Sequence, residues 1–161
     1  MSGIHATQEA LEEFNSFKMQ NSRKGTKYSY IVYRIIDEKV VITKKQERVE
    51  DMDIEDQWED FCQSLNFPVD SEGKEDENGT RGGAYGTFDF TTKVEGLTIS
   101  KGIFVTWAPG DVSVRQRLLI GATAESFRAE LGSASFHHVV QAGNFENLDI
   151  NHIYKKFKIR K

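Results

Sequence analysis

The stretch FVTWAPGDVSVRQRLLIGATAESFRAEL, residues 104–131, decides the fold of this chain. Its first residues, together with Ile103, form a β-branched and aromatic run that ends at Trp107 and favours a strand. Pro109-Gly110 ends the run, because this dipeptide marks a turn. The remaining residues have helical spacing. We therefore predict a strand, a turn and a long helix in direct succession.

The limits and the buried face of this helix follow from its sequence. Ser113 and Gln116 have the spacing of a capping box, so Ser113 is the expected N-cap. Gly132 stands where a C-cap glycine belongs, so the helix should end at Leu131. Apolar residues at helical spacing define the face expected to be buried, namely Ile120, Ala124, Phe127 and Leu131.

The opposite face of the helix is unusually smooth for a solvated surface. It carries Arg115, Leu118, Ala122, Glu125 and Ala129, with Arg117 at its edge. Cations near a helix N-terminus oppose the macrodipole by roughly a few tenths of a kcal/mol each, and Gly121 costs about 1 kcal/mol relative to alanine. Such a face either meets a partner or is a solvated surface built from small side chains. The pattern leaves both interpretations open.

Composition narrows the class of protein. The chain has 161 residues, enough for one domain spanning residues 1–161 with its own core. No apolar run approaches the ~20 residues of a membrane span, and the polar N-terminus predicts no secretory signal. Cys62 is the one cysteine, so no intramolecular disulfide can form. A net charge of −4 argues against nucleic-acid binding. We expect a cytoplasmic or a nuclear protein.

The other elements are predicted in chain order. Thr7 caps a helix that runs to about Met19, and the acidic, glycine-containing segment 66–83 is a flexible loop insertion without chemistry. The predicted strands are 28–36, 39–45, 84–91 and 136–141, and a short hairpin at 93–101 leads into a further strand that ends at Trp107. Two other helices are predicted. One spans 54–65 and is capped by Asp53, and the last one is capped by Asn147 or Asp149. The expected fold is α/β, a central mixed sheet of about five strands sandwiched by helices.

No enzyme signature is present in the sequence. Cys62 lies on the apolar face of its helix and is expected to be a buried hydrophobe. His137 and His138 alternate faces of a strand, so they are unsuited to one metal site. The glycines of 82–86 precede a strand, which leaves no helix N-terminus to hold a phosphate. We therefore expect neither catalysis, nor a cofactor, nor a bound metal.

A family resemblance rests on the central stretch. Trp107-Ala108-Pro109, followed by a basic-x-basic pair and apolar residues in 114–120, resembles the core motif of the ADF/cofilin family. The order of helices and strands is similar over nearly the whole chain, apart from 66–83. The resemblance implies the actin-depolymerising-factor homology fold. It also implies that the long helix inserts into the cleft between two actin subdomains.

The resemblance assigns site residues. Ser2-Gly3-Ile4 resembles the N-terminal actin contact, with Ser2 a phosphorylation site. The implied actin-binding residues are Ser2, Gly3, Ile4, Arg115, Arg117, Leu118, Ala122, Lys155 and Lys156, with Lys93 and Lys101 on a filament-side hairpin. This hairpin is short and basic only at its ends, whereas severing cofilins have a longer one with a basic cluster. We therefore expect weak filament binding and severing.

The first functional hypothesis, which the resemblance implies, is a monomeric actin-binding protein of the cytoskeleton. It would bind monomeric and filamentous actin, prefer the ADP form and promote filament disassembly and turnover. A second hypothesis is a phosphoinositide-binding module that uses Arg115, Arg117 and the C-terminal cations. A protein that mainly sequesters monomers, and an enzyme of unrecognised type, are further alternatives.

Overall fold

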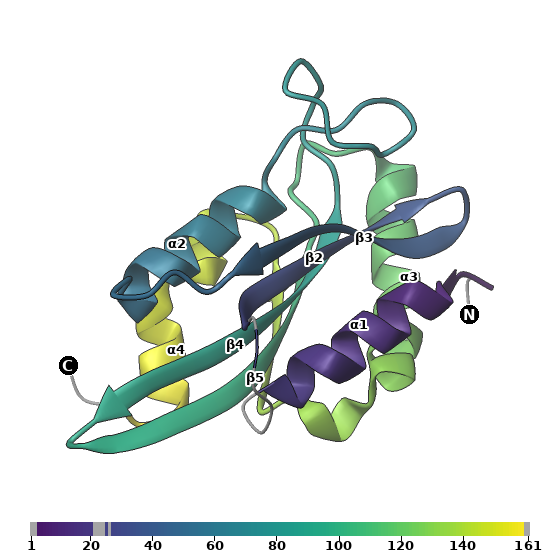
Figure 1. Ribbon diagram of the computed structural model, residues 1–161. Helices are drawn as coiled ribbons and strands as arrows, with labels where there is room; N and C mark the ends of the chain where they lie inside the picture. The colour runs from purple at the N-terminus through teal and green to yellow at the C-terminus, as the bar shows by residue number, and fades with distance from the viewer. Residues whose placement is uncertain (1–2, 21–24, 26, 160–161) are drawn as a thin grey trace.

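A computed structural model describes residues 3–20, 25 and 27–159 and shows a six-stranded mixed sheet (Figure 1). The strand order is β1-β3-β2-β4-β5-β6, with β1/β3 and β5/β6 parallel and the other neighbours antiparallel. The strands are β1 (His5–Ala6), β2 (Tyr28–Ile36), β3 (Lys39–Glu47), β4 (Ala84–Val94), β5 (Leu97–Trp107) and β6 (His138–Ala142). The predicted α/β sandwich is confirmed. The additional strand β1 was not predicted, because two residues carry no alternating pattern.

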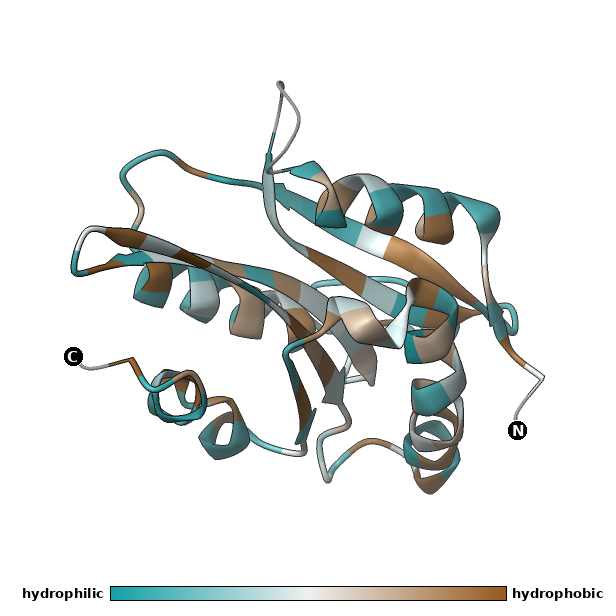
Figure 2. Cartoon of the chain, turned by 90° about the horizontal axis from the view of Figure 1, so that it is seen from below, coloured by the Kyte–Doolittle hydropathy of each residue, from teal (hydrophilic) through white to brown (hydrophobic). Residues whose placement is uncertain are grey.

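Helices cover both faces of the sheet. They are α1 (Gln8–Lys18), α2 (Ile54–Leu65), α3 (Val114–Leu131) and α4 (Ile150–Lys156), with short 3-10 turns η2 (Ser133–Ser135) and η3 (Phe145–Leu148). Figure 1 shows α1 and α3 on one face and α2 and α4 on the other. In Figure 2 the helices carry alternating hydrophobic and hydrophilic residues, as expected of helices that bury only one side.

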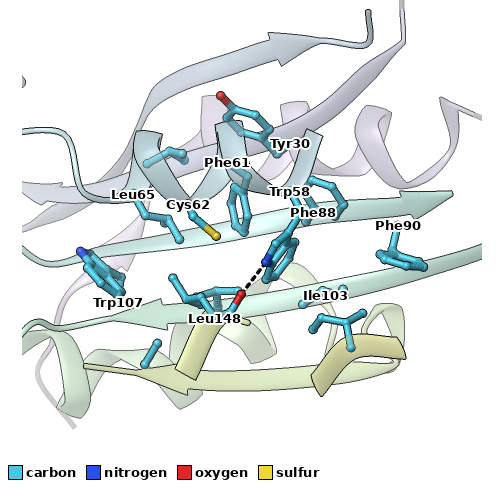
Figure 3. Packing of buried hydrophobic residues seen from close by; sticks show 14 of the residues in the cluster. Tyr30, Trp58, Phe61, Cys62, Leu65, Phe88, Phe90, Ile103, Trp107 and Leu148 are labelled. Carbon is cyan, nitrogen blue, oxygen red and sulfur yellow. Dashed lines mark hydrogen bonds between the residues drawn. The ribbon is translucent and has the colours of Figure 1, made fainter. Parts of the chain in front are cut away.

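Each face of the sheet has its own aromatic core. Under α2 and α4, the Trp58 ring meets the Phe88 ring edge-on at 5.1 Å, with Phe61 beside both (Figure 3). Under α1 and α3, the Phe127 ring meets the Tyr33 ring edge-on at 5.0 Å. Because both faces are covered, β2 is buried over most of its length, as its apolar sequence predicts, and β4 is buried from Ala84 to Phe90.

The predicted helix starts are confirmed by the caps. The side chains of Thr7, Asp53 and Ser113 each accept a hydrogen bond from the backbone N–H three residues later. The capping box itself is not closed, however. The Gln116 side chain does not return to Ser113; its Oε1 accepts from the backbone N–H of Gly83 at 2.9 Å.

The loop at 66–83 is tied to the core by contacts that the sequence did not predict. Val69 forms bridges with Glu75 and Thr80. Below the loop lies Arg34 of β2, which is 1% exposed. Its guanidinium donates to four backbone carbonyls, those of Ser64, Leu65, Phe67 and Gly83, and its Nε lies 3.5 Å from Glu75 Oε2. A charged residue in a strand sequence gave no sign of this role.

The hairpin also differs from its prediction. β4 and β5 remain paired from Ala84↔Trp107 to Val94↔Leu97, so the hairpin is long and its turn is only Glu95-Gly96. Both turn residues have positive φ, 52° and 82°, as a two-residue hairpin turn requires. The polar run Thr91-Thr92-Lys93 hid the end of β4, because it shows no alternation of apolar and polar positions.

Replacing Arg34 should destabilise the whole domain. Arg34→Ala leaves four carbonyls without their donor and Glu75 without its ion-pair partner, and removing one partner from a buried charged network typically costs about 3–5 kcal/mol. Urea unfolding measures this loss, and limited proteolysis should show new cleavage within 66–83. The control is Lys45→Ala, whose surface pair with Glu13 should contribute less than about 1 kcal/mol. Equal losses in the two variants would contradict the role given to Arg34.

Candidate functional site

The outer face of α3 is an exposed apolar surface with two cations. Leu118 is 67% exposed and Val114 63% exposed. With Arg115, Leu119 and Ala122 they line a shallow depression of about 530 Å³. Arg117 is exposed beside it. The structure therefore brings four predicted site residues, Arg115, Arg117, Leu118 and Ala122, to one end of one helix.

The opposite side of α3 is fixed to the sheet. Ile120, Thr123, Phe127 and Leu131 are buried, which confirms the predicted apolar face except that Thr123 joins it and Ala124 is half-buried. The Tyr85 hydroxyl donates to the backbone carbonyl of Ile120 at 2.5 Å. Burial raises the pKa of Tyr85, so this donor stays protonated. The helix is a rigid platform for its outer face.

The N-terminal residues only partly join this surface. Ser2 lies outside the described residues, and Gly3 is exposed with a φ of 75°. Ile4, which the resemblance assigns to the partner contact, is 5% exposed, and its side chain packs in the core under α1 and α3. The next residues pass alongside α3, where the Ala6 N–H donates to Glu130 Oε1 at 3.3 Å.

A second surface lies at the far end of the β4–β5 hairpin. A groove of about 750 Å³ runs between this hairpin, the start of α2 and the end of α4. Lys93 and Lys158 line it, and Lys155 and Lys156 are exposed on α4. Lys101 pairs with Phe90, roughly 10 Å further from the turn than Lys93. The hairpin cations therefore form no cluster, in agreement with the sequence.

Sequence reasoning missed two residues of this second surface. Leu97, at the hairpin turn, is 72% exposed. Lys158 follows α4 with a positive φ of 57° and lines the groove. Leu97 begins the alternating run Leu97-Thr98-Ile99-Ser100, and Lys158 is one of the C-terminal cations, but neither pattern indicated exposure beside this groove. The predicted C-terminal site instead rested on Lys155 and Lys156.

The sheet separates the two surfaces. α3 lies on one face, and α4 lies on the other (Figure 1). The cations of α3 and those of α4 therefore cannot converge on one small ligand. A macromolecular partner would contact them as separate sites.

The surroundings of Cys62 and the placement of the histidine and acidic side chains do not support catalytic chemistry. Burial raises the pKa of the Cys62 thiol to about 12, so it stays protonated and packs as a hydrophobe. Within residues 3–20, 25 and 27–159, no three histidine, cysteine or acidic side chains are grouped as metal ligands. None of the helices in this part of the chain could cross a bilayer.

Comparison with known proteins points to one family. Residues 3–158 match the family model described as cofilin/tropomyosin-type actin-binding protein. The cofilin of Cryptococcus neoformans is 27% identical over 157 residues, covering 96% of each chain. The cofilin of Yarrowia lipolytica is 30% identical over 137 residues, covering 83% of this chain and 74% of its own length.

Solved structures share the fold. Actin depolymerization factor 2 of Plasmodium berghei superposes with a TM-score of 0.70 at 20% identity, over 98% of this chain and 95% of its own. The cofilin of Streptomyces griseoflavus gives 0.69 at 15% identity, over 96% of each chain.

Alanine substitutions at two nearby positions of α3 should differ in their effect on stability, because one side chain is exposed and the other is buried. Leu118→Ala should change the free energy of unfolding by less than about 0.5 kcal/mol, as surface substitutions do. Ile120→Ala, only two residues away, removes a side chain that is 2% exposed and should cost about 2–5 kcal/mol. Urea unfolding measures both. A core-sized loss at Leu118 would show that the face is assigned wrongly.

Proposed function

The chain belongs to the family of cofilin/tropomyosin-type actin-binding proteins, and on this premise we propose that it binds actin monomers and filaments and promotes filament disassembly. The observation that carries the proposal is the outer face of α3, where exposed Leu118 and Val114 lie beside Arg115 and Arg117. Nothing in the protein's own stability explains this face. A cleft with an apolar interior and an acidic rim would be complementary to it.

The proposed activity is binding without bond chemistry. A protein that binds one conformation of actin more tightly shifts the polymer equilibrium toward that conformation. We propose preference for ADP-actin on the family resemblance. The rigid attachment of α3 supports this mechanism, because a preformed contact surface loses little conformational entropy on binding.

The second surface supports a separate filament contact. It lies on α4 and the hairpin, away from α3, so both surfaces can be occupied at once. We propose that this contact is weak, because Lys93 and Lys101 are far apart and Glu95 lies at the turn. The protein should therefore bind monomers better than filament sides and sever weakly. If the filament contact were absent altogether, the protein would only sequester monomers.

Ser2 is proposed as a regulatory site. Phosphorylation would add about −1.5 to −2 charge to the N-terminal segment, which approaches α3 through β1. An acidic actin surface would be repelled. Ser2→Glu should therefore lower affinity for monomeric actin in a fluorescence titration, without lowering the melting temperature. Wild-type affinity in this variant would argue against the switch.

Phosphoinositide binding is the alternative that a specific observation favours. Arg115 and Arg117 are exposed in the first turn of a helix, where the macrodipole also attracts an anionic head group. The C-terminal cations lie across the sheet and would act as a separate site. Flotation with vesicles containing phosphoinositide tests this function independently of actin. We further propose that the protein acts as a monomer among cytoplasmic actin filaments.

The arginine pair provides the decisive test of the proposed function. Arg115→Ala/Arg117→Ala should leave stability unchanged or slightly raised, because both cations oppose the helix dipole. Affinity for monomeric actin should fall at least tenfold, about 1.4 kcal/mol, as is common for arginines at the centre of an interface. A control with the same charge change is Lys39→Ala/Lys45→Ala on β3. Normal actin binding by the arginine variant would exclude α3 as the site.

The α4 cations should act only on filaments. Lys155→Ala/Lys156→Ala removes two exposed charges outside the buried side of α4, so stability should change by less than about 0.5 kcal/mol. Co-sedimentation with filaments should decrease and become less sensitive to salt, while monomer affinity stays unchanged. Unchanged co-sedimentation would remove α4 from the filament contact. Frequent filament breaks by the wild type at sub-micromolar protein, seen by single-filament imaging, would contradict weak severing.

A further inference from the structure

A third groove lies between α2 and the η3–α4 segment. Its volume is about 620 Å³. Trp58, Cys62 and Leu148 contribute its floor, each only 3% exposed. Figure 3 shows these three side chains between the helix and the η3 segment. The proposed actin contacts on α3 and at the hairpin do not account for this groove.

One aromatic side chain on the rim is exposed. Phe145 of η3 is 43% exposed, although its ring lies 5.4 Å from the Trp107 ring, which holds it in place. Ile150 lines the same groove and is half-buried. The groove therefore offers a fixed apolar contact that the protein's own core does not use.

The rims of the groove are acidic. Glu55 and Glu59 come from α2, and Glu146 and Asp149 come from the η3–α4 segment. No lysine or arginine lines the groove among the residues that the structure describes. α2 has four acidic residues and no basic residue in its sequence IEDQWEDFCQSL. Carboxylates on both sides of an apolar floor attract a cationic, amphipathic partner.

Hydrogen bonds hold the two walls at a fixed separation. The Trp58 Nε1–H donates to the Leu148 carbonyl at 2.6 Å, drawn as a dashed line in Figure 3. The Tyr154 hydroxyl donates to Glu55 Oε1 at 3.1 Å. These two bonds join α2 to both ends of the opposite wall. A partner would therefore find the groove already formed.

We propose that this groove docks a short amphipathic helix of another protein, with an apolar residue against Phe145 and lysines or arginines along both rims. A helix suits a groove whose walls are themselves helical, because its side chains pack between theirs. Long cationic side chains can cover the apolar rim with their stems while their charges reach the carboxylates. α2 and α4 lie across the sheet from α3, so this partner would leave the α3 surface accessible (Figure 1).

The test uses a synthetic peptide of about four helical turns, with leucines on one face and lysines elsewhere. A scrambled peptide of the same composition has no apolar face and is the peptide control. Fluorescence anisotropy with the wild-type protein should show at least about tenfold tighter binding of the amphipathic peptide. Amide chemical shifts should change in α2 and η3. The measurement contains no actin, so its result does not depend on the proposed function.

Matched variants assign the binding to the groove. Glu59→Lys/Glu146→Lys should weaken peptide binding at least about tenfold, and Phe145→Ala several-fold, with melting curves confirming that each variant is folded. Glu12→Lys/Glu77→Lys changes the net charge equally at exposed positions outside the groove and should bind like the wild type.

Four results would overturn the proposal. They are equal loss of binding in both charge-reversed variants, equal binding of the scrambled peptide, no binding of either peptide, and a wild-type dimer that Glu59→Lys/Glu146→Lys abolishes. The last result would make a second copy of this chain the occupant.

Discussion

The buried guanidinium of Arg34 connects the end of α2 with the start of β4 and, through Gly83 and Gln116, with α3. Its Nη2 donates to the carbonyls of Ser64 and Leu65 in the last turn of α2, where a cation is also favourable to the helix dipole. Its Nη1 donates to the Gly83 carbonyl, and the N–H of Gly83 donates to Gln116 in α3. Burial lowers the pKa of Arg34 and Glu75 opposes this, so the side chain remains a cation at neutral pH. One network thus runs from α2 through the start of β4 to α3.

Much of the fold was predictable because local patterns and tertiary packing agree. α2 and β2 have the bounds that their sequences predict, and the outward direction of Leu118 followed from helical spacing alone. Two of the failures share one cause, which is dependence on distant partners. The order in 66–83 comes from Arg34, which is remote in the sequence. The burial of Ile4 comes from β1 pairing with β3, which no residue of the N-terminal segment reveals.

The residues of the candidate site could be predicted from the sequence, but their positions relative to one another could not. The sequence indicated cations in α3, the hairpin and the last helix. It could not show that the sheet places α3 opposite α4, because that depends on which face each crossover covers. Nor could it show that Lys101 is set back from the hairpin turn, since its position depends on strand register. Topology, rather than composition, divides the cations into two sites.

Gly121 is a residue of α3 that the packing of the fold does not explain. It is exposed in the middle of the helix, and a Cβ atom there would meet nothing within 4 Å. Alanine would therefore fit, and glycine costs the helix about 1 kcal/mol. By contrast, a Cβ at Gly83 would lie 2.5 Å from Ile120 Cγ1, so packing itself requires that glycine. A glycine that packing does not require, on the same helix as Arg115 and Leu118, is accounted for if a partner's surface approaches the backbone closely there.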